Sequence, residues 1–118
     1  MREDEYSAFV ESLKKPGDAI IASLTPEKAD IWHMATLLSG ETGELVDALK
    51  KWIIYGKQID HANVVEELGD IEFAQAGIRS AFGLSRDLVV GANVDKLSRR
   101  YASGSYSDEE AIIRADKQ

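Results

Sequence analysis

The sequence predicts an all-α fold, an antiparallel bundle of four to five helices completed by homo-oligomerisation. Only two prolines occur, and the chain after Pro26 carries helical apolar periodicity almost throughout. No alternating stretch bounded by hairpin turns appears, which argues against strands. With 118 residues, 44% of them hydrophobic, the chain is expected to form one domain over residues 1–118 with a modest core. Small helical chains of this kind commonly pair with a copy of themselves.

Two breaks organise the first third of the chain. Pro16 ends a first helix and precedes a short helical turn. Thr25 then caps a long helix with Pro26 at its first position, which suits proline because the first helical N–H needs no partner. The expected segments are Asp4–Lys14, Asp18–Ser23 and Thr25–Tyr55.

Glycines and serines mark the remaining helix ends. Gly56 and Gly83 stop two long helices, and Ser85 begins the next one. Ser107, with Glu110 three residues later, forms a capping-box pattern for a short last helix. The expected segments are Asp60–Gly83, Ser85–Tyr101 and a helix beginning at Ser107. Because the loop around Gly56 is short, the two long helices should run antiparallel, side by side.

Composition excludes several classes of protein. The formal net charge of −7 argues against a nucleic-acid partner, which would require a basic face. The absence of cysteine excludes disulfides, zinc–thiolate sites and thiol nucleophiles. The acidic first five residues lack an apolar signal core, and no apolar run approaches the ~20 residues that a membrane span requires. We therefore expect a soluble, cytoplasmic protein without a membrane partner.

Four carboxylates on the two long helices form the most informative pattern. Glu41 and Glu44 are three residues apart, as are Glu67 and Asp70, so each pair shares one helix face. The rest of each face is apolar or small, which places both acid pairs in line with the expected core seams. On the first helix the other members are Met34, Leu37, Ala48 and Trp52, and on the second they are Ala74, Gly77 or Ile78, and Ala81.

No basic residue lies nearby to compensate these acids, since residues 41–49 and 58–78 contain neither lysine nor arginine. Buried carboxylates are costly unless something pairs with them. Four oxygen ligands without histidine or cysteine suit Mg²⁺, or Mn²⁺, rather than zinc. A solvated acidic face and a metal-free, proton-sharing cluster are the structural alternatives. A ferritin-like di-iron site is disfavoured because His33 and His61 do not follow a glutamate by three.

The same residues carry a family resemblance. The segments 39–45 (SGETGEL) and 66–70 (EELGD) resemble the two signature helices of the MazG-like all-α nucleotide pyrophosphohydrolases, and segment 93–101 (NVDKLSRRY) is similar to their third conserved block. The resemblance covers about residues 30–101, and more loosely the tail from Ser107 to Asp116. It implies a helical homodimer or dimer of dimers. It also implies Mg²⁺-dependent hydrolysis of an NTP or dNTP between the α and β phosphates, giving monophosphate and pyrophosphate.

The resemblance also assigns residues to roles. The metal ligands would be Glu41, Glu44, Glu67 and Asp70. Residues that would meet the phosphates or the sugar lie in the third block, and two aromatic positions could meet the base. These substrate-binding candidates are Asn93, Lys96, Arg100, Tyr101, His33 and Trp52.

Several alternatives stay open at the level of sequence. Either Glu41 or Glu44 could activate the attacking water as a general base. The cations near Arg100 also fit a structural role at a helix C-terminus, and Trp52 also fits a core or a dimer interface. A same-fold hydrolase of dUTP or phosphoribosyl-ATP has the same signature. A non-catalytic helical bundle that binds nucleotides or a protein is the alternative from a different class.

Overall fold

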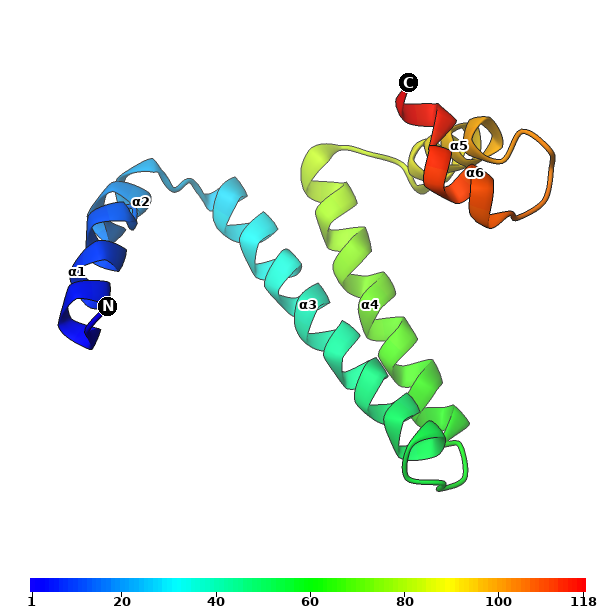
Figure 1. The fold of residues 1–118 in the computed structure, drawn as a ribbon, viewed down its shortest axis with the longest axis horizontal. Helices are drawn as coiled ribbons and strands as arrows, with labels where there is room; N and C mark the ends of the chain where they lie inside the picture. The colour runs from blue at the N-terminus through cyan, green and yellow to red at the C-terminus, as the bar shows by residue number, and fades with distance from the viewer.

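The computed structural model describes residues 1–118, and the chain is entirely helical, as the sequence predicts (Figure 1). A single 3-10 turn, η1, follows the last α-helix and was not expected from the sequence. The elements in chain order are α1 (Glu3–Leu13), α2 (Gly17–Ser23), α3 (Pro26–Ile53), α4 (His61–Phe82), α5 (Arg86–Arg100), α6 (Asp108–Ile113) and η1 (Ala115–Lys117).

Helix ends follow the local signals in the sequence. The side chains of Thr25, Asp60 and Ser85 each accept a hydrogen bond from the backbone N–H three residues further on, at 3.2, 3.0 and 3.1 Å. These bonds satisfy N–H groups that the helix itself leaves unpaired. Gly83 ends α4 with a left-handed φ of 67°, at little steric cost because glycine lacks a Cβ. Gly56, three residues after the end of α3, turns the chain with a φ of 69°.

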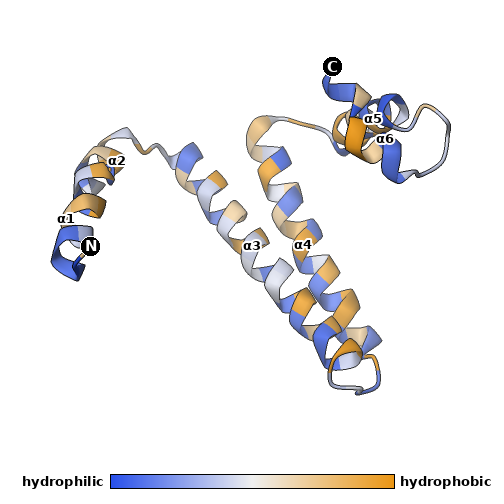
Figure 2. Cartoon of the chain, in the orientation of Figure 1, coloured by the Kyte–Doolittle hydropathy of each residue, from blue (hydrophilic) through white to orange (hydrophobic).

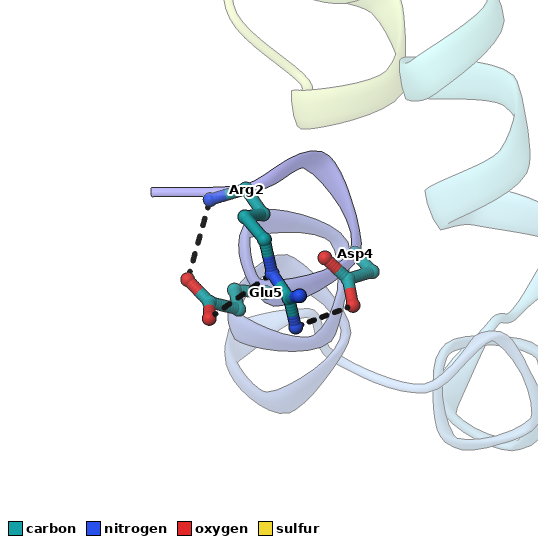
Figure 3. A network of polar contacts seen from close by, with 3 residues as sticks. All are labelled: Arg2, Asp4 and Glu5. Carbon is teal, nitrogen blue, oxygen red and sulfur yellow. Dashed lines mark hydrogen bonds and ion pairs between the residues drawn. The ribbon is translucent and has the colours of Figure 1, made fainter.

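The first helix is held by local polar contacts rather than by packing. The backbone N–H of Arg2 donates to Glu5 Oε2 at 3.2 Å, and its guanidinium lies 3.3 Å from Asp4 Oδ2, closing the first turn of α1 (Figure 3). No residue of α1 is buried. An isolated helix of 11 residues is marginal in water, so α1 requires a partner for its apolar side.

Helices α3 and α4 pack against each other as an antiparallel hairpin (Figure 1). Among the buried and half-buried positions, one series on each helix recurs at alternating spacings of three and four, which is the pattern of a coiled-coil seam. On α3 they are Ile31, Met34, Leu38, Glu41, Leu45 and Ala48. On α4 they are Val64, Glu67, Ile71, Ala74, Ile78 and Ala81.

A glycine allows the two helices to approach closely near the open end of the hairpin. A Cβ atom placed on Gly77 would lie 2.6 Å from Met34 Sδ and 2.8 Å from Met34 Cγ. Both distances are far below van der Waals contact. The missing side chain at Gly77 therefore accommodates the Met34 thioether.

The single chain does not close the four- to five-helix bundle that the sequence suggested. Besides the α3/α4 pair, broad contact exists only within the unit formed by α5, α6 and η1. The Cα radius of gyration is 20.3 Å, whereas a compact chain of this length would have about 13–14 Å. Figure 1 shows the reason: α1 and α2, and the α5/α6 unit, both leave the open end of the hairpin and extend away from it to opposite sides.

The open arrangement leaves much apolar surface in contact with solvent. Apolar residues, orange in Figure 2, occur along α4 and within the flanking helices. Trp32 and Phe73 are 75% and 65% exposed. Trp32 also lines an apolar groove of about 970 Å³ between α2, α3 and the end of α4, together with Ile20, Leu24 and Phe82. None of the helices combines the length and apolar character needed to cross a bilayer.

The close approach at Gly77 can be tested with two alanine substitutions. Gly91→Ala, on α5 with nothing within 4 Å, should stabilise the protein by about 0.5–1 kcal/mol through helix propensity alone. Gly77→Ala should be less stable than Gly91→Ala by about 1–3 kcal/mol because Met34 must move. Urea denaturation at one fixed protein concentration measures both. Equal stabilities would contradict the packing at this position.

Candidate metal centre

Two seam positions of the α3/α4 hairpin are occupied by acids instead of apolar residues. Glu41 on α3 is half-buried, and Glu67 on α4 is buried. Asp70, one turn further along α4, is half-buried as well. One carboxylate oxygen from each of these three residues lies within 4.8 Å of the others. The antiparallel pairing of the two helices therefore brings the expected acids together.

No positive charge compensates this cluster. One oxygen of Glu41 and one of Glu67 are fully buried, and no donor group outside the acidic cluster gives either a hydrogen bond. The only ion pair within the hairpin joins Lys51 to Asp47 at 3.2 Å, so it does not involve the cluster. Buried polar atoms are normally satisfied. These two oxygens are thus free to accept a cation, and an all-oxygen donor set suits a hard divalent ion.

The proximity of the acids changes their protonation. The pKa of Glu67 is raised from 4.5 to about 7, chiefly by a side-chain hydrogen bond with Glu41, then by burial and by the charge of Glu44. Ionising several neighbouring carboxyls in a poorly solvated position costs free energy, because the negative charges repel one another. A divalent cation would supply the missing charge and displace the proton.

Glu44 does not lie on the core seam, where the sequence analysis expected it. The seam passes through Leu45 and not through Glu44, which is exposed. The prediction that both acids of this pair lie on the core seam is therefore wrong for Glu44. A helix turn of 3.6 residues places position 44 beside the seam when position 41 lies on it. Glu44 still lies near enough to Glu67 to affect its pKa, so it borders the cluster from the solvent side.

A comparison with known protein families agrees with this geometry. The MazG nucleotide pyrophosphohydrolase domain matches residues 31–104, which is more than half of the chain and contains both acidic pairs.

The chain belongs to the MazG nucleotide pyrophosphohydrolase family. The resemblance of the signature segments is thereby confirmed. No curated protein and no solved structure matches the chain significantly. For this MazG protein the cluster of Glu41, Glu67 and Asp70 is a possible metal site, and a divalent metal is the usual requirement of the family.

The four substrate-binding candidates of the third block lie on or beside α5, away from the acidic cluster. Asn93 and Tyr101 line one cleft of about 390 Å³, together with Leu97 and Tyr106. Lys96 is half-buried. Helix α5 makes no broad contact with α3 or α4, so one chain does not bring these side chains to the carboxylates.

Arg100, His33 and Trp52 have distinct surroundings. Arg100 forms an ion pair with Asp116, at 2.7 Å between Nε and Oδ1. His33 is exposed on α3, and Trp52 near the end of α3 is 46% exposed. Trp52 is therefore not a core residue of the single chain, which leaves an interface role and a base contact.

Two residues of the α5/α6 unit were not singled out from the sequence. Tyr106 lies with its ring centroid 5.7 Å from that of Tyr101, and Asp116 pairs with Arg100. Aromatic residues in a glycine- and serine-rich loop gave a weak signal for Tyr106. No local pattern indicated Asp116, because its partner lies 16 residues away.

The raised pKa of Glu67 makes the metal-free protein sensitive to pH. The folded state binds this proton more tightly than the unfolded state, so the contribution of Glu67 to stability is fully present below pH 4.5 and is lost as the pH rises through about 7. We expect the melting temperature, measured in chelator at fixed protein concentration, to fall over this window. Glu67→Gln should flatten that part of the profile. An identical slope in wild type and Glu67→Gln would show that Glu67 does not hold the proton.

Proposed function

We propose that the protein is a Mg²⁺-dependent nucleoside triphosphate pyrophosphohydrolase, which cleaves an NTP or dNTP between the α and β phosphates. The observation that carries the proposal is the acidic cluster on the α3/α4 seam, whose two buried oxygens receive no hydrogen bond from outside the cluster. Membership of the MazG family supports the reaction class. The products would be a nucleoside monophosphate and pyrophosphate.

The metal would be held by Glu41, Glu67 and Asp70, with Glu44 as a fourth carboxylate at the rim. When bound, Mg²⁺ or Mn²⁺ neutralises phosphate oxygens and lowers the pKa of a coordinated water. The helical scaffold holds these side chains at positions set by packing on both sides. Ala48 and Ala74 are buried seam residues one or two turns away, which keeps the cluster on the rigid part of the molecule.

Glu44 is our choice for the general base. It lies outside the tight group of three acids, and it is exposed to the solvent from which the attacking water comes. A carboxylate that the metal does not fully occupy can accept the proton of that water. Glu41, by contrast, is half-buried with an unpartnered oxygen, as expected for a ligand.

Phosphate and sugar contacts would come from Asn93, Lys96, Arg100 and Tyr101. Lysine and arginine are the groups that bind phosphate in an otherwise acidic protein. Base contacts would come from His33 and Trp52, which are exposed on the same helix as Glu41. We include residues 1–118 in a single functional domain.

Homo-oligomerisation would complete the site, because α5 and the acidic cluster do not meet in one chain. The accessible surface is 9329 Å², whereas a folded monomer of this mass would expose about 6,300 Å². The excess exceeds the ~800 Å² per partner of a standard interface. A homodimer or a dimer of dimers would bury the apolar groove and the exposed faces of α4 and α5.

The roles proposed for Glu67, a metal ligand, and Glu44, the general base, predict different effects of their substitution on Mg²⁺ affinity. Glu67→Gln should lower both Mg²⁺ affinity and pyrophosphate release, the latter by about 100-fold or more. Glu44→Gln should lower the rate by a similar factor and leave Mg²⁺ affinity within a few-fold of wild type. Calorimetry measures the affinity, and product analysis across the NTPs and dNTPs measures the reaction.

Glu66→Gln is the matched control, since Glu66 is an exposed acid adjacent to Glu67. It should retain activity. Wild-type rates in Glu67→Gln, with helix content unchanged by circular dichroism, would refute the metal site. Release of diphosphate and phosphate would refute the cleavage position.

Oligomerisation can be tested on the exposed face of α4. Sedimentation should give a mass of two or four times the 13.0 kDa chain. Phe73→Asp should shift the protein towards monomer, because a charge would replace a large apolar side chain in the proposed interface. Gln75→Asp places the same charge at an exposed polar position of α4 and should leave the mass unchanged. A monomeric wild-type protein would exclude the assembly.

A further inference from the structure

One ion pair differs from all others in the molecule. Arg100 Nε donates to Asp116 Oδ1 at 2.7 Å, and Arg100 Nη2 donates to Asp116 Oδ2 at 3.1 Å. The two residues are 16 positions apart, whereas the partners of every other ion pair lie within four positions of each other. This contact therefore results from tertiary structure and not from local helix geometry.

The pair is also shielded from solvent. The Asp116 side chain is 1% exposed and that of Arg100 is 17% exposed, whereas the side chains of the other pairs are more than half exposed. The Arg100 guanidinium lowers the pKa of Asp116, and Asp116 raises the pKa of Arg100. Both groups are therefore charged at neutral pH, and the bidentate geometry fixes the plane of the guanidinium.

The turn after α6 places Asp116 against Arg100 of α5. Arg114 adopts a left-handed φ of 53°, which ends α6 and redirects the chain into η1. The start of α6 is anchored by Glu110, which accepts from the Ser103 hydroxyl at 2.6 Å and from the Ser107 hydroxyl at 3.0 Å. The loop, helix and turn thus form a continuous support for the carboxylate.

Asp116 does not occupy every N–H group of the Arg100 guanidinium. Arginine has five N–H groups, and Asp116 takes one from Nε and one from Nη2. Three N–H groups, on Nη1 and Nη2, are left. Arg100 follows Lys96 by four residues and Asn93 by seven, so the three share one face of α5.

We propose that Asp116 is a positioning residue, which clamps one edge of Arg100 so that the opposite edge, beside Lys96, binds the phosphate chain of the substrate. The proposal rests on the proposed function for the identity of the ligand. It assigns a task to the η1 turn, which lies outside the part of the chain matched by the family. Two other interpretations predict different results: a purely structural clasp, and a carboxylate that occupies the place of a phosphate.

The test uses the full chain and inorganic pyrophosphate as the probe, in the presence of Mg²⁺. Asp116→Asn keeps the shape of the side chain and removes its charge. Pyrophosphate binding, measured by calorimetry, should weaken by about 10-fold, as is typical when the residue that orients a binding group is lost. Asp116→Glu should restore part of the affinity. Where wild type hydrolyses nucleotides, kcat/KM should fall by a similar factor.

Two further variants test whether Asp116 acts through Arg100. Asp4→Asn breaks an exposed Arg–Asp pair of the same chemistry and should leave binding unchanged. In an Arg100→Ala background, Asp116→Asn should have no additional effect on pyrophosphate affinity. An undiminished effect in that background would overturn the proposal, because Asp116 would then act independently of Arg100. A loss of binding by Asp116→Asn that accompanies a loss of helix content by circular dichroism would overturn it in favour of a structural clasp.

The remaining outcomes also decide the question. Tighter pyrophosphate binding by Asp116→Asn would overturn the proposal, because it would mean that the carboxylate competes with phosphate. Unchanged binding, or no binding by wild type, would overturn it as well. Pyrophosphate binding by a wild-type protein that hydrolyses no nucleotide would refute the proposed function alone, and the comparison of Asp116 variants would remain valid.

Discussion

The pairing of α3 with α4 is the constraint on which the rest of the structure depends. Its seam follows a three-four spacing, and most seam positions are apolar. Glu41 and Glu67 interrupt this seam at facing levels, and Asp70 adds a third oxygen within 4.8 Å. The packing that stabilises the hairpin therefore also forces the acids together. Without a cation this costs stability, which the raised pKa of Glu67 reflects.

Much of the fold could be predicted because its signals are local. Thr25 and Ser85 cap helices where the sequence suggested. Asp60 caps α4 at the expected start of that helix, and Gly83 ends α4 with a left-handed φ. The meeting of Glu41 with Glu67 followed from spacing and a short connection. The exposure of Glu44 did not, because a spacing of three is compatible with two neighbouring stripes, and only the partner helix decides which one is buried.

Contacts between distant residues, and contacts between chains, could not be predicted from the sequence. Asp116 reaches Arg100 across 16 residues through a left-handed residue, Arg114, that no turn motif announced. A closed bundle was expected, yet apolar side chains of α1, α4 and α5 lack partners within the chain. Amphipathic periodicity shows that a helix face needs covering. It does not show whether the cover comes from the same chain or from another.

The separation of the acidic hairpin from the α5/α6 unit has a consequence for how activity depends on the concentration of the protein. Only Gly83, Leu84 and Ser85 join the two units. The proposed metal ligands lie on one unit, and the proposed phosphate-binding residues lie on the other. If assembly is what unites them, each dilute chain holds an inert half-site for metal and an inert half-site for phosphate. Specific activity would then follow the fraction of assembled chains. The amount of protein made would set the catalytic output per molecule as well as the number of molecules.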